Sequence, residues 1–231
     1  MIDGILFDVH RTLVDDSGFP RERIWRLIAG SGVEIDLDAY YKQYHQLSAQ
    51  MFDWRRIDPF ITIREIHRRR LLRYYELYDV KRDVEADLEY LWREMGKSKI
   101  YPEVPEVLNH LKGNYRIGLL SNADDDDPLI EILLNAGFTF DAVVTSQACQ
   151  IYKPDTRIFD YALKALELDR QQVLMVGDSL VSDVAGAVAA GIDAVWINRS
   201  NQSLQKEFPK PTHQISNMNQ LLVILNHRRY T

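Results

Sequence analysis

Four short apolar runs of strand length constrain the fold of this chain more than any other feature. They are Ile5 to Phe7, Arg116 to Leu120, Asp141 to Thr145 and Val173 to Val176, and we expect a fifth strand at Ala194 to Ile197. Segments of helix length separate most of these runs, which is typical of parallel strands joined by crossover helices. The pattern therefore predicts an α/β fold, a parallel sheet with helices on both faces.

The interval from about Val14 to Lys99 contains no convincing strand. Within it, Leu88, Leu91, Trp92 and Met95 follow the i, i+3, i+4, i+7 spacing of one buried helical face. We expect several helices there, inserted directly after the first strand. This divides the chain into an α/β core of residues 1–13 and 100–231 and an all-helical domain of residues 14–99.

Composition narrows the class of protein and its partners. The chain has 231 residues, of which 46% are hydrophobic and 27% charged, as in globular proteins. A formal net charge of -6 argues against nucleic acid as the main partner, because phosphate backbones are bound by surplus Lys and Arg. The absence of 18 consecutive apolar residues argues against a membrane span. One cysteine, Cys149, favours a reducing, cytoplasmic setting, and nothing indicates the oligomeric state.

Side chains that can bind ligands or take part in catalysis lie just after the predicted strands or, for Lys153, in the loop that follows one. In open α/β sheets the ligand crevice lies at the carboxyl ends of the strands, so these side chains are expected to meet there. In chain order they are Asp8, His10 and Thr12, then Ser121 and Asn122, then Lys153, and finally Asp178 and Asp183. Carboxylates, a lysine and hydroxyl groups at one sheet edge suit a divalent cation and a phosphoryl group.

The chemistry that such a set supports is phosphoryl transfer. A carboxylate can attack phosphorus and form an acyl-phosphate, which splits one hard displacement into two easier ones. A hard cation such as Mg²⁺, held by Asp8 and Asp178, would neutralise the two approaching anions. Lys153 and Ser121 would hold the non-bridging oxygens of the phosphoryl group.

The ordered motifs resemble those of the haloacid dehalogenase-like hydrolase superfamily. They are Asp8-Val-His-Arg-Thr12-Leu, Leu-Leu-Ser121-Asn122, Lys153-Pro154-Asp155, and Val-Gly177-Asp178-Ser179-x3-Asp183 with Ala-Gly-x4-Gly191. The resemblance implies a Rossmann-like core with a helical C1-type cap after the first motif. It further implies Asp8 as nucleophile, Ser121 and Lys153 as phosphate ligands, and Asp178 with Asp183 around Mg²⁺.

Thr12 and Asn122 complete the set of candidate site residues, and three members of the set also have a structural alternative. Thr12 is a candidate catalytic residue that carries a hydroxyl, and Asn122 is grouped with Ser121 as a phosphate-binding residue. The pair Ser121-Asn122 also fits a simple helix cap. Lys153 also fits an ordinary exposed loop lysine.

His10 departs from the pattern of the superfamily's phosphatases. They carry a second aspartate at this position, as general acid and base, and a glycine where this chain has Arg11. Imidazole could replace the acid at neutral pH, while the backbone carbonyl of His10 still binds the metal. In that case His10→Asp should raise hydrolysis. The alternatives are metal-independent dehalogenation, or a weakened or lost activity with the fold kept for binding.

Retained acids favour the metal enzyme. The superfamily's dehalogenases lack the second aspartate but also replace the acidic fourth motif, whereas Asp178 and Asp183 are both present. We therefore expect a Mg²⁺-dependent phosphatase of small phosphorylated metabolites that works through an aspartyl-phosphate. The alternatives are a metal-independent 2-haloacid dehalogenase-type hydrolase and a weakly active or non-catalytic binding protein.

Two runs of charged residues can be explained by helix structure and solvation. Asp124 to Asp127, followed by Pro128, is typical of an acidic helix start with proline at the first helical position. The basic run in the helical insert fits a solvated helix face, or alternatively an anionic substrate contacted by the closed cap. Its members are Arg64, Arg68, Arg69, Arg70 and Arg73.

Overall fold

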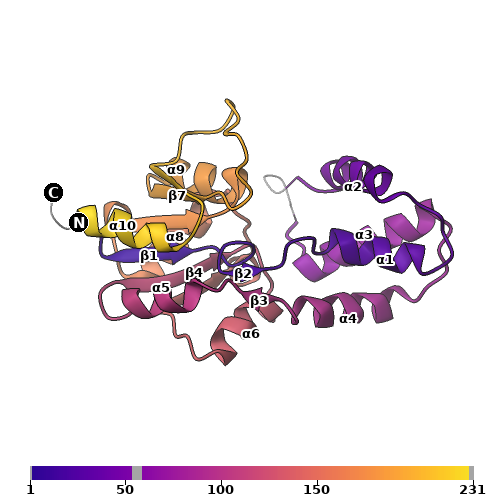
Figure 1. Ribbon diagram of the computed structural model, residues 1–231, viewed down its shortest axis with the longest axis horizontal. Helices are drawn as coiled ribbons and strands as arrows, with labels where there is room; N and C mark the ends of the chain where they lie inside the picture. Colours follow the sequence, from indigo (N-terminus) through magenta and orange to yellow (C-terminus); the bar gives the residue numbers. More distant parts are fainter. Residues whose placement is uncertain (1, 54–58, 229–231) are drawn as a thin grey trace.

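The computed structural model describes residues 2–53 and 59–228, and a six-stranded parallel sheet lies at its centre. The strand order is β5-β4-β1-β6-β7-β8. Figure 1 labels β4, β1 and β7 of this sheet. In that order the strands are Ala142–Thr145, Arg116–Ser121, Gly4–Phe7, Val173–Gly177, Asp193–Ile197 and His213–Ile215. The predicted α/β class is confirmed, and β1 lies between β4 and β6.

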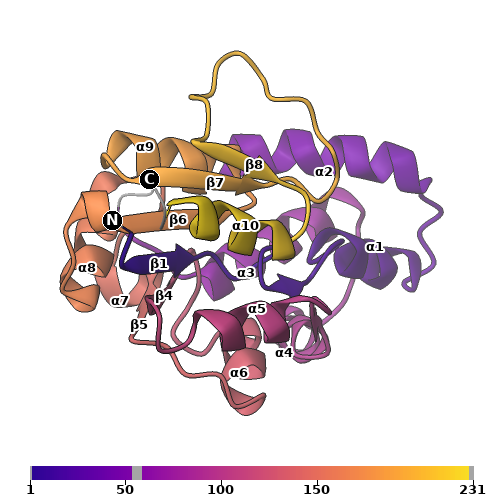
Figure 2. The same cartoon turned by 60° about the vertical axis from the view of Figure 1, so that its left-hand side comes forward.

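Helices cover both faces of the sheet, as Figure 2 shows from a second direction. Because successive residues of a strand point to opposite faces, β1 contributes to two separate cores. Ile5 and Phe7 belong to the core packed by α5, α6 and α10, and Leu6 to the core packed by α8 and α9. These helices comprise Val104–Leu111, Pro128–Asn135, Asn219–Arg228, Thr156–Leu166 and Gly186–Ala189. Two further short helices of the core are α7 (Ser146–Cys149) and η1 (Arg170–Gln172).

Within its described residues, the insert that follows β1 contains four helices, and it lies to the right of the sheet in Figure 1. They are α1 (Arg21–Ala29), α2 (Leu37–Met51), α3 (Ile63–Leu77) and α4 (Val84–Met95). All four apolar residues that predicted a buried helix face, from Leu88 to Met95, are buried on α4. The chain leaves the core through β2 (Val14–Asp15) and returns through β3 (Lys99–Ile100), which pair antiparallel.

The aspartate run joins the two parts of the molecule. Asp127 caps α6 by accepting the backbone N–H of Leu129 at 2.8 Å, with Pro128 at the first turn, as the sequence predicted. Asp124 accepts the backbone N–H groups of Ile63 and Arg64, both at 2.8 Å. A core carboxylate therefore caps α3 of the insert, where it complements the positive end of the helix dipole.

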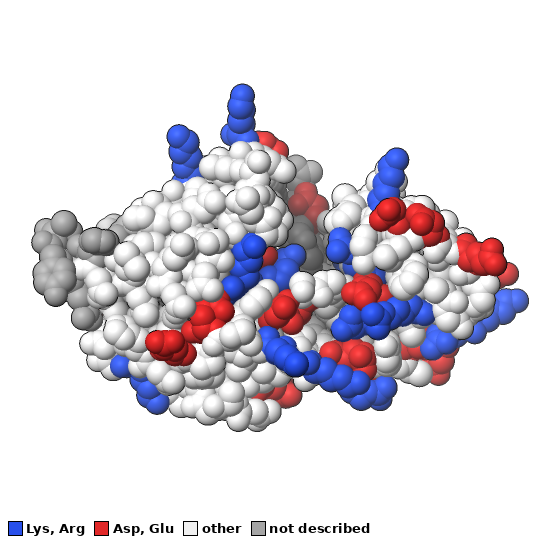
Figure 3. Space-filling model, in the orientation of Figure 1, with Lys and Arg blue, Asp and Glu red and all other residues white. Residues whose placement is uncertain are grey.

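Three strands escaped prediction. β2, β3 and β8 have only two or three residues each, too short to show the period-2 alternation that signals a strand. Among the described residues, no helix has the length and apolar character needed to cross a membrane. Charged side chains of both signs are interspersed over the insert in Figure 3.

Candidate active site

Three neighbouring strands deliver carboxylates and a hydroxyl to one edge of the sheet. Asp8 follows β1, Ser121 ends β4, and Asp178 follows β6. Asp183 lies in the π-helical segment η2 (Leu180–Ala185), which begins just after Asp178. One oxygen from each of Asp8, Asp178 and Asp183 lies within 4.8 Å of the other two. The predicted convergence of these acids is therefore present in the structure.

Both oxygens of the Asp8 carboxylate are held in place. Lys153 Nζ donates to Oδ1 at 2.8 Å, and Thr12 Oγ1 donates to Oδ2 at 3.1 Å. Thr12 is completely buried, and Asp8 is 6% exposed. The side chain of Asp8 is thus oriented by a charged and a neutral donor, an arrangement that suits a nucleophile with a fixed direction of attack.

Lys153 joins Asp8 to Asp183. Its Nζ also donates to Asp183 Oδ1 and to the carbonyl of Leu120, both at 2.7 Å. Burial alone would lower the pKa of Lys153, but Asp183 and Asp8 outweigh it and raise that pKa above its ordinary value. Lys153 is a buried ammonium rather than an exposed loop lysine.

Asn122 positions the loop that carries Lys153. Its Nδ2 donates to the carbonyl of Lys153 at 3.0 Å, and its Oδ1 accepts the backbone N–H of Lys153 at 2.7 Å. This pair of hydrogen bonds is a role that the sequence did not predict. The predicted contact of Asn122 with phosphate stays a prediction.

Gly177 lets Asp183 approach the end of β6. A Cβ at position 177 would lie 2.3 Å from the carboxylate of Asp183, closer than any side chain could tolerate. Asp183 Oδ2 also accepts the backbone N–H of Ser179 at 2.9 Å. The conformation of the Gly177-Asp178-Ser179 turn is therefore linked to the buried carboxylate that follows it.

Two carboxyl groups of the acidic cluster, those of Asp178 and Asp183, have raised pKa values. Burial raises the pKa of Asp178 to about 7 against the opposing effect of Arg11, and repulsion from Asp8 and Asp183 acts in the same direction as burial. Burial likewise raises the pKa of Asp183 to about 6, against the opposing effect of Lys153. Carboxylates with raised pKa values gain free energy from a bound cation, because the cation removes their mutual repulsion.

The donor set fits a hard divalent cation. Mg²⁺ prefers carboxylate oxygen, and opposite ligands of its octahedral shell lie roughly 4 Å apart at metal–oxygen distances of about 2.1 Å. The spread of 4.8 Å among the three aspartates is comparable. The backbone carbonyl of His10, the remaining predicted ligand, stays a prediction.

Arg11 already supplies positive charge to this cluster. Its Nε lies 3.1 Å from Oδ2 of Asp178. The backbone of Arg11 has φ +55°, a left-handed conformation that favours glycine, and its N–H donates to Asp16 Oδ1 at 3.0 Å. Asp16 therefore helps to hold a turn that aims an arginine at a predicted metal ligand.

The imidazole of His10 lies between two carboxylates. Nδ1 lies 2.8 Å from Asp16 Oδ2, and Nε2 lies 3.0 Å from Asp127 Oδ2. Burial alone would lower the pKa of His10, but Asp127 and Asp16 outweigh it and raise that pKa well above 6.5. The ring is therefore an imidazolium at neutral pH, with both N–H groups engaged. Sequence reasoning found neither partner, since nothing in the local pattern relates Asp127 to His10.

A cleft of about 420 Å³ opens above these residues, between the sheet edge and the insert. Asp8, Ser121 and Lys153 line it from the core, and Tyr44, His67 and Arg70 from the insert. The hydroxyl of Ser121 is buried and has no hydrogen-bond partner among the described residues. An unsatisfied buried hydroxyl in a cleft is free to bind an incoming polar group.

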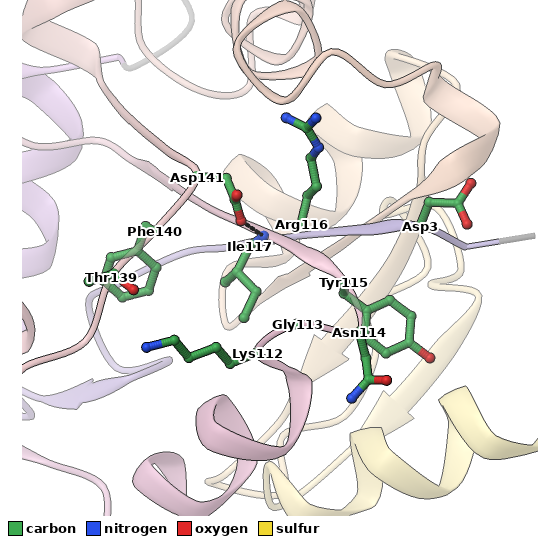
Figure 4. Close-up of a pocket in the computed structure, with 10 residues that line it drawn as sticks. All are labelled: Asp3, Lys112, Gly113, Asn114, Tyr115, Arg116, Ile117, Thr139, Phe140 and Asp141. Carbon is green, nitrogen blue, oxygen red and sulfur yellow. Dashed lines mark hydrogen bonds between the residues drawn. The ribbon is translucent and has the colours of Figure 1, made fainter.

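A second hollow, of about 450 Å³, lies at the opposite end of the sheet, at the amino ends of β1 and β4. Figure 4 shows that its charged side chains, including Asp3, Lys112 and Arg116, point in different directions. Asp141 is used structurally there, because its Oδ2 accepts the backbone N–H of Ile117 at 2.8 Å. This hollow has no convergent set of groups and lies far from the acidic cluster.

Comparison with known proteins agrees with this geometry. A family model described as haloacid dehalogenase-like hydrolase matches residues 2–191. Glyceraldehyde 3-phosphate phosphatase of Pyrococcus abyssi is 30% identical over 203 residues, which cover 85% of this chain and 81% of that protein. (S)-2-haloacid dehalogenase 4A of Burkholderia cepacia is 27% identical over 230 residues, which cover 96% and 91%.

Among solved structures, the HAD-hydrolase YfnB of Bacillus subtilis, bound to magnesium, superposes with a TM-score of 0.79. The match has 22% identity and covers 97% of this chain and 99% of that chain, so it supports the fold. The relatives include both phosphatases and dehalogenases. With its motifs at one sheet edge and a family match over most of its length, the chain belongs to the haloacid dehalogenase-like hydrolases.

Proposed function

We propose that this hydrolase is a Mg²⁺-dependent phosphatase of small phosphorylated metabolites. The observation that carries the proposal is the cluster of Asp8, Asp178 and Asp183, whose oxygens lie within 4.8 Å of one another. Dehalogenases of the superfamily replace the acidic fourth motif, and this chain retains it. In this proposal residues 14–99 act as a cap over a core of residues 1–13 and 100–231.

The phosphate end of the substrate would meet donors that are already in place. The hydroxyl of Ser121, which has no hydrogen-bond partner in the described part of the chain, can donate to a non-bridging oxygen without giving up a bond to any described residue. Lys153 carries positive charge beside Asp8, where negative charge accumulates during phosphoryl transfer. Mg²⁺, held by the three aspartates, would neutralise charge on the phosphate and on Asp8.

Asp8 would act as the nucleophile. One of its oxygens forms a bond to phosphorus as the bond from phosphorus to the leaving oxygen breaks, which gives an aspartyl-phosphate. Water then attacks this phosphorus, releases phosphate and regenerates the Asp8 carboxylate. Thr12 and Lys153 keep the carboxylate oriented through both steps.

His10 is our candidate for the acid and base, under a constraint. Its two ring nitrogens both contact carboxylates, so a proton can reach the leaving oxygen only if a contact with Asp16 or Asp127 opens. Asp16 lies in the segment between β2 and α1, through which the chain enters the insert. Movement of the insert would therefore be the natural way to open the Asp16 contact.

A second candidate function is metal-independent dehalogenation of 2-haloacids. The observation that favours it is the charge already present, because Arg11 lies against Asp178, and Lys153 against Asp8 and Asp183. Two cations thus neutralise most of the charge of three carboxylates. In this case Asp8 would displace halide from carbon and form an ester that water hydrolyses.

One experiment separates the two functions. Release of phosphate from a panel of phosphate monoesters, including p-nitrophenyl phosphate, is measured with MgCl₂ and with EDTA. Release of chloride from 2-chloropropanoate is measured under the same conditions. Phosphate release that needs Mg²⁺ and disappears in Asp8→Asn supports the proposal. Chloride release that persists in EDTA would establish the second function instead.

A further inference from the structure

Arg70 differs from the other arginines of its run on α3. Four of them form ion pairs with glutamates at the surface of the insert: Arg64 with Glu89, Arg68 with Glu85, Arg69 with Glu65 and Arg73 with Glu76. Arg70 is 6% exposed, and no carboxylate among the described residues pairs with it. The mixed charges on the insert in Figure 3 agree with a solvated face for the four paired arginines.

Among the described residues, Arg70 has aromatic rings and a histidine beside its positive charge rather than a carboxylate. Its guanidinium carbon lies 5.3 Å from the ring centroid of Tyr44 and 5.7 Å from that of Phe52. Nη1 lies 3.0 Å from His67 Nδ1, and Nε is buried without a partner among the described residues. Burial and the neighbouring Arg70 lower the pKa of His67 well below 6.5, so this ring is neutral and accepts from Nη1.

A buried cation without a counter-charge costs folding free energy, since desolvation is not offset by an ion pair. Aromatic rings recover part of that cost through cation–π attraction. An anionic ligand would recover more, because charge-assisted hydrogen bonds to guanidinium are strong. Arg70 lines the same cleft as Asp8 and Ser121, so such a ligand would reach the predicted phosphate site.

We propose that Arg70 binds a carboxylate of the substrate, so that the substrate is a short phosphate monoester carrying a carboxylate at its other end. The phosphate end rests on the proposed function, whereas the carboxylate end rests on Arg70 alone. A carboxylate matches the site better than a second phosphate does, because the neutral His67 leaves only one positive charge there. The cleft of about 420 Å³ is of a size that holds a small molecule.

Three non-hydrolysable ligands test the proposal. Dissociation constants of 3-phosphonopropanoate and propylphosphonate, which differ in the terminal carboxylate, are measured by calorimetry in the presence of Mg²⁺. The wild type should prefer 3-phosphonopropanoate by about 10- to 100-fold. Arg70→Met, which keeps much of the apolar stem, should abolish this preference while binding propylphosphonate as the wild type does. Ethylene bisphosphonate tests whether a second phosphate is favoured.

Arg69→Met is the matched control, since Arg69 is adjacent in sequence but pairs with Glu65 at the surface. It should retain the full preference. Arg70→Lys, which keeps the charge but not the fork of donors, should retain part of it. If Arg70→Met does not fold, as judged by thermal unfolding, the wild type and Arg70→Lys decide the question.

Three results would overturn the proposal: no preference in the wild type, a preference that survives Arg70→Met, or tighter binding of the bisphosphonate than of 3-phosphonopropanoate. Failure of the proposed function is seen separately. A wild type that hydrolyses no phosphate ester with Mg²⁺ rejects the phosphatase, yet the phosphonate pair still reports on Arg70. The two failures are therefore distinguishable.

Discussion

Nε2 of His10 lies 3.0 Å from Oδ2 of Asp127, a residue 117 positions further along the chain that also caps α6. This contact, with that to Asp16, makes the imidazolium a link between the first strand, the entry to the insert and a core helix. His10, which departs from the phosphatase motif, is therefore held in place by a carboxylate at each ring nitrogen.

Replacement of His10 by aspartate should destabilise the protein. The sequence alone led us to expect higher hydrolysis from His10→Asp, but in the structure the new carboxylate would face those of Asp16 and Asp127. We expect the free energy of unfolding at pH 7 to fall by about 1–3 kcal/mol, measured by urea denaturation.

Combining His10→Asp with Asp127→Asn removes one of the facing charges. This double variant should recover part of the lost stability. A single His10→Asp variant that is as stable as the wild type and hydrolyses faster would contradict this expectation.

The stabilising effect of His10 should depend on pH. Its pKa is raised in the folded protein, so folding favours the protonated ring. This contribution is fully present below the unfolded pKa of about 6.5 and is lost as pH rises through the folded pKa. The difference in free energy of unfolding between wild type and His10→Asn should therefore shrink as the pH rises above about 6.5. His110→Asn, on an exposed turn of α5, provides the reference curve.

Leaving groups should reveal whether His10 delivers a proton. Because both N–H groups contact carboxylates, we expect esters whose leaving oxygen needs no proton to react faster. The value of kcat for p-nitrophenyl phosphate should exceed that for ethyl phosphate by about 100-fold or more. Comparable rates for the two esters would show that an effective acid operates. Asp16→Asn, which weakens one contact, should narrow the gap.

The central strands were predictable from sequence because each is an uninterrupted apolar run that differs from the polar segments on either side. Ile5 to Phe7 falls within β1, and Val173 to Val176 within β6. Burial of the residues from Leu88 to Met95 on α4 shows that helical periodicity was equally informative in the insert. The strand β8, with three residues at the sheet edge, carries no such pattern. Its place depends on pairing with β7, a long-range contact.

The acids of the site were predictable because strand ends of a parallel sheet meet at one edge. The partners of His10 were not, since they depend on the path of the chain after β1 and on the start of α6. Arg70 did leave a signal. It lies on the same helical stripe as the buried residues Ile63, Ile66, His67 and Tyr74 of α3, whereas Arg69 and Arg73 do not. A basic residue on an apolar stripe is a better indicator of function than the run of arginines itself.

Removal of the Arg11 side chain should strengthen metal binding. The guanidinium lies 3.1 Å from Asp178 and competes with a cation for that carboxylate. Glycine is favoured at φ +55°, so Arg11→Gly should not disturb the turn. We expect the dissociation constants of Mg²⁺ and Mn²⁺, measured by calorimetry, to fall by about tenfold.

Arg11→Lys, which keeps the positive charge, is the control and should bind metal more weakly than Arg11→Gly. Equal metal affinity in wild type and Arg11→Gly would mean that the guanidinium moves aside without cost.

The hydroxyl of Ser121 offers the sharpest separation of function from stability. It is buried at the end of β4 and has no hydrogen-bond partner among the described residues, so Ser121→Ala breaks no bond within the protein. Its free energy of unfolding should change by less than about 1 kcal/mol, whereas kcat/KM for phosphate esters should fall by about 10- to 100-fold. Ser146→Ala is the matched control, because the buried Ser146 Oγ donates to the carbonyl of Ala123 at 2.9 Å. That variant should lose about 1 kcal/mol of stability and little activity. Equal losses of activity in the two variants would remove Ser121 from the phosphate site.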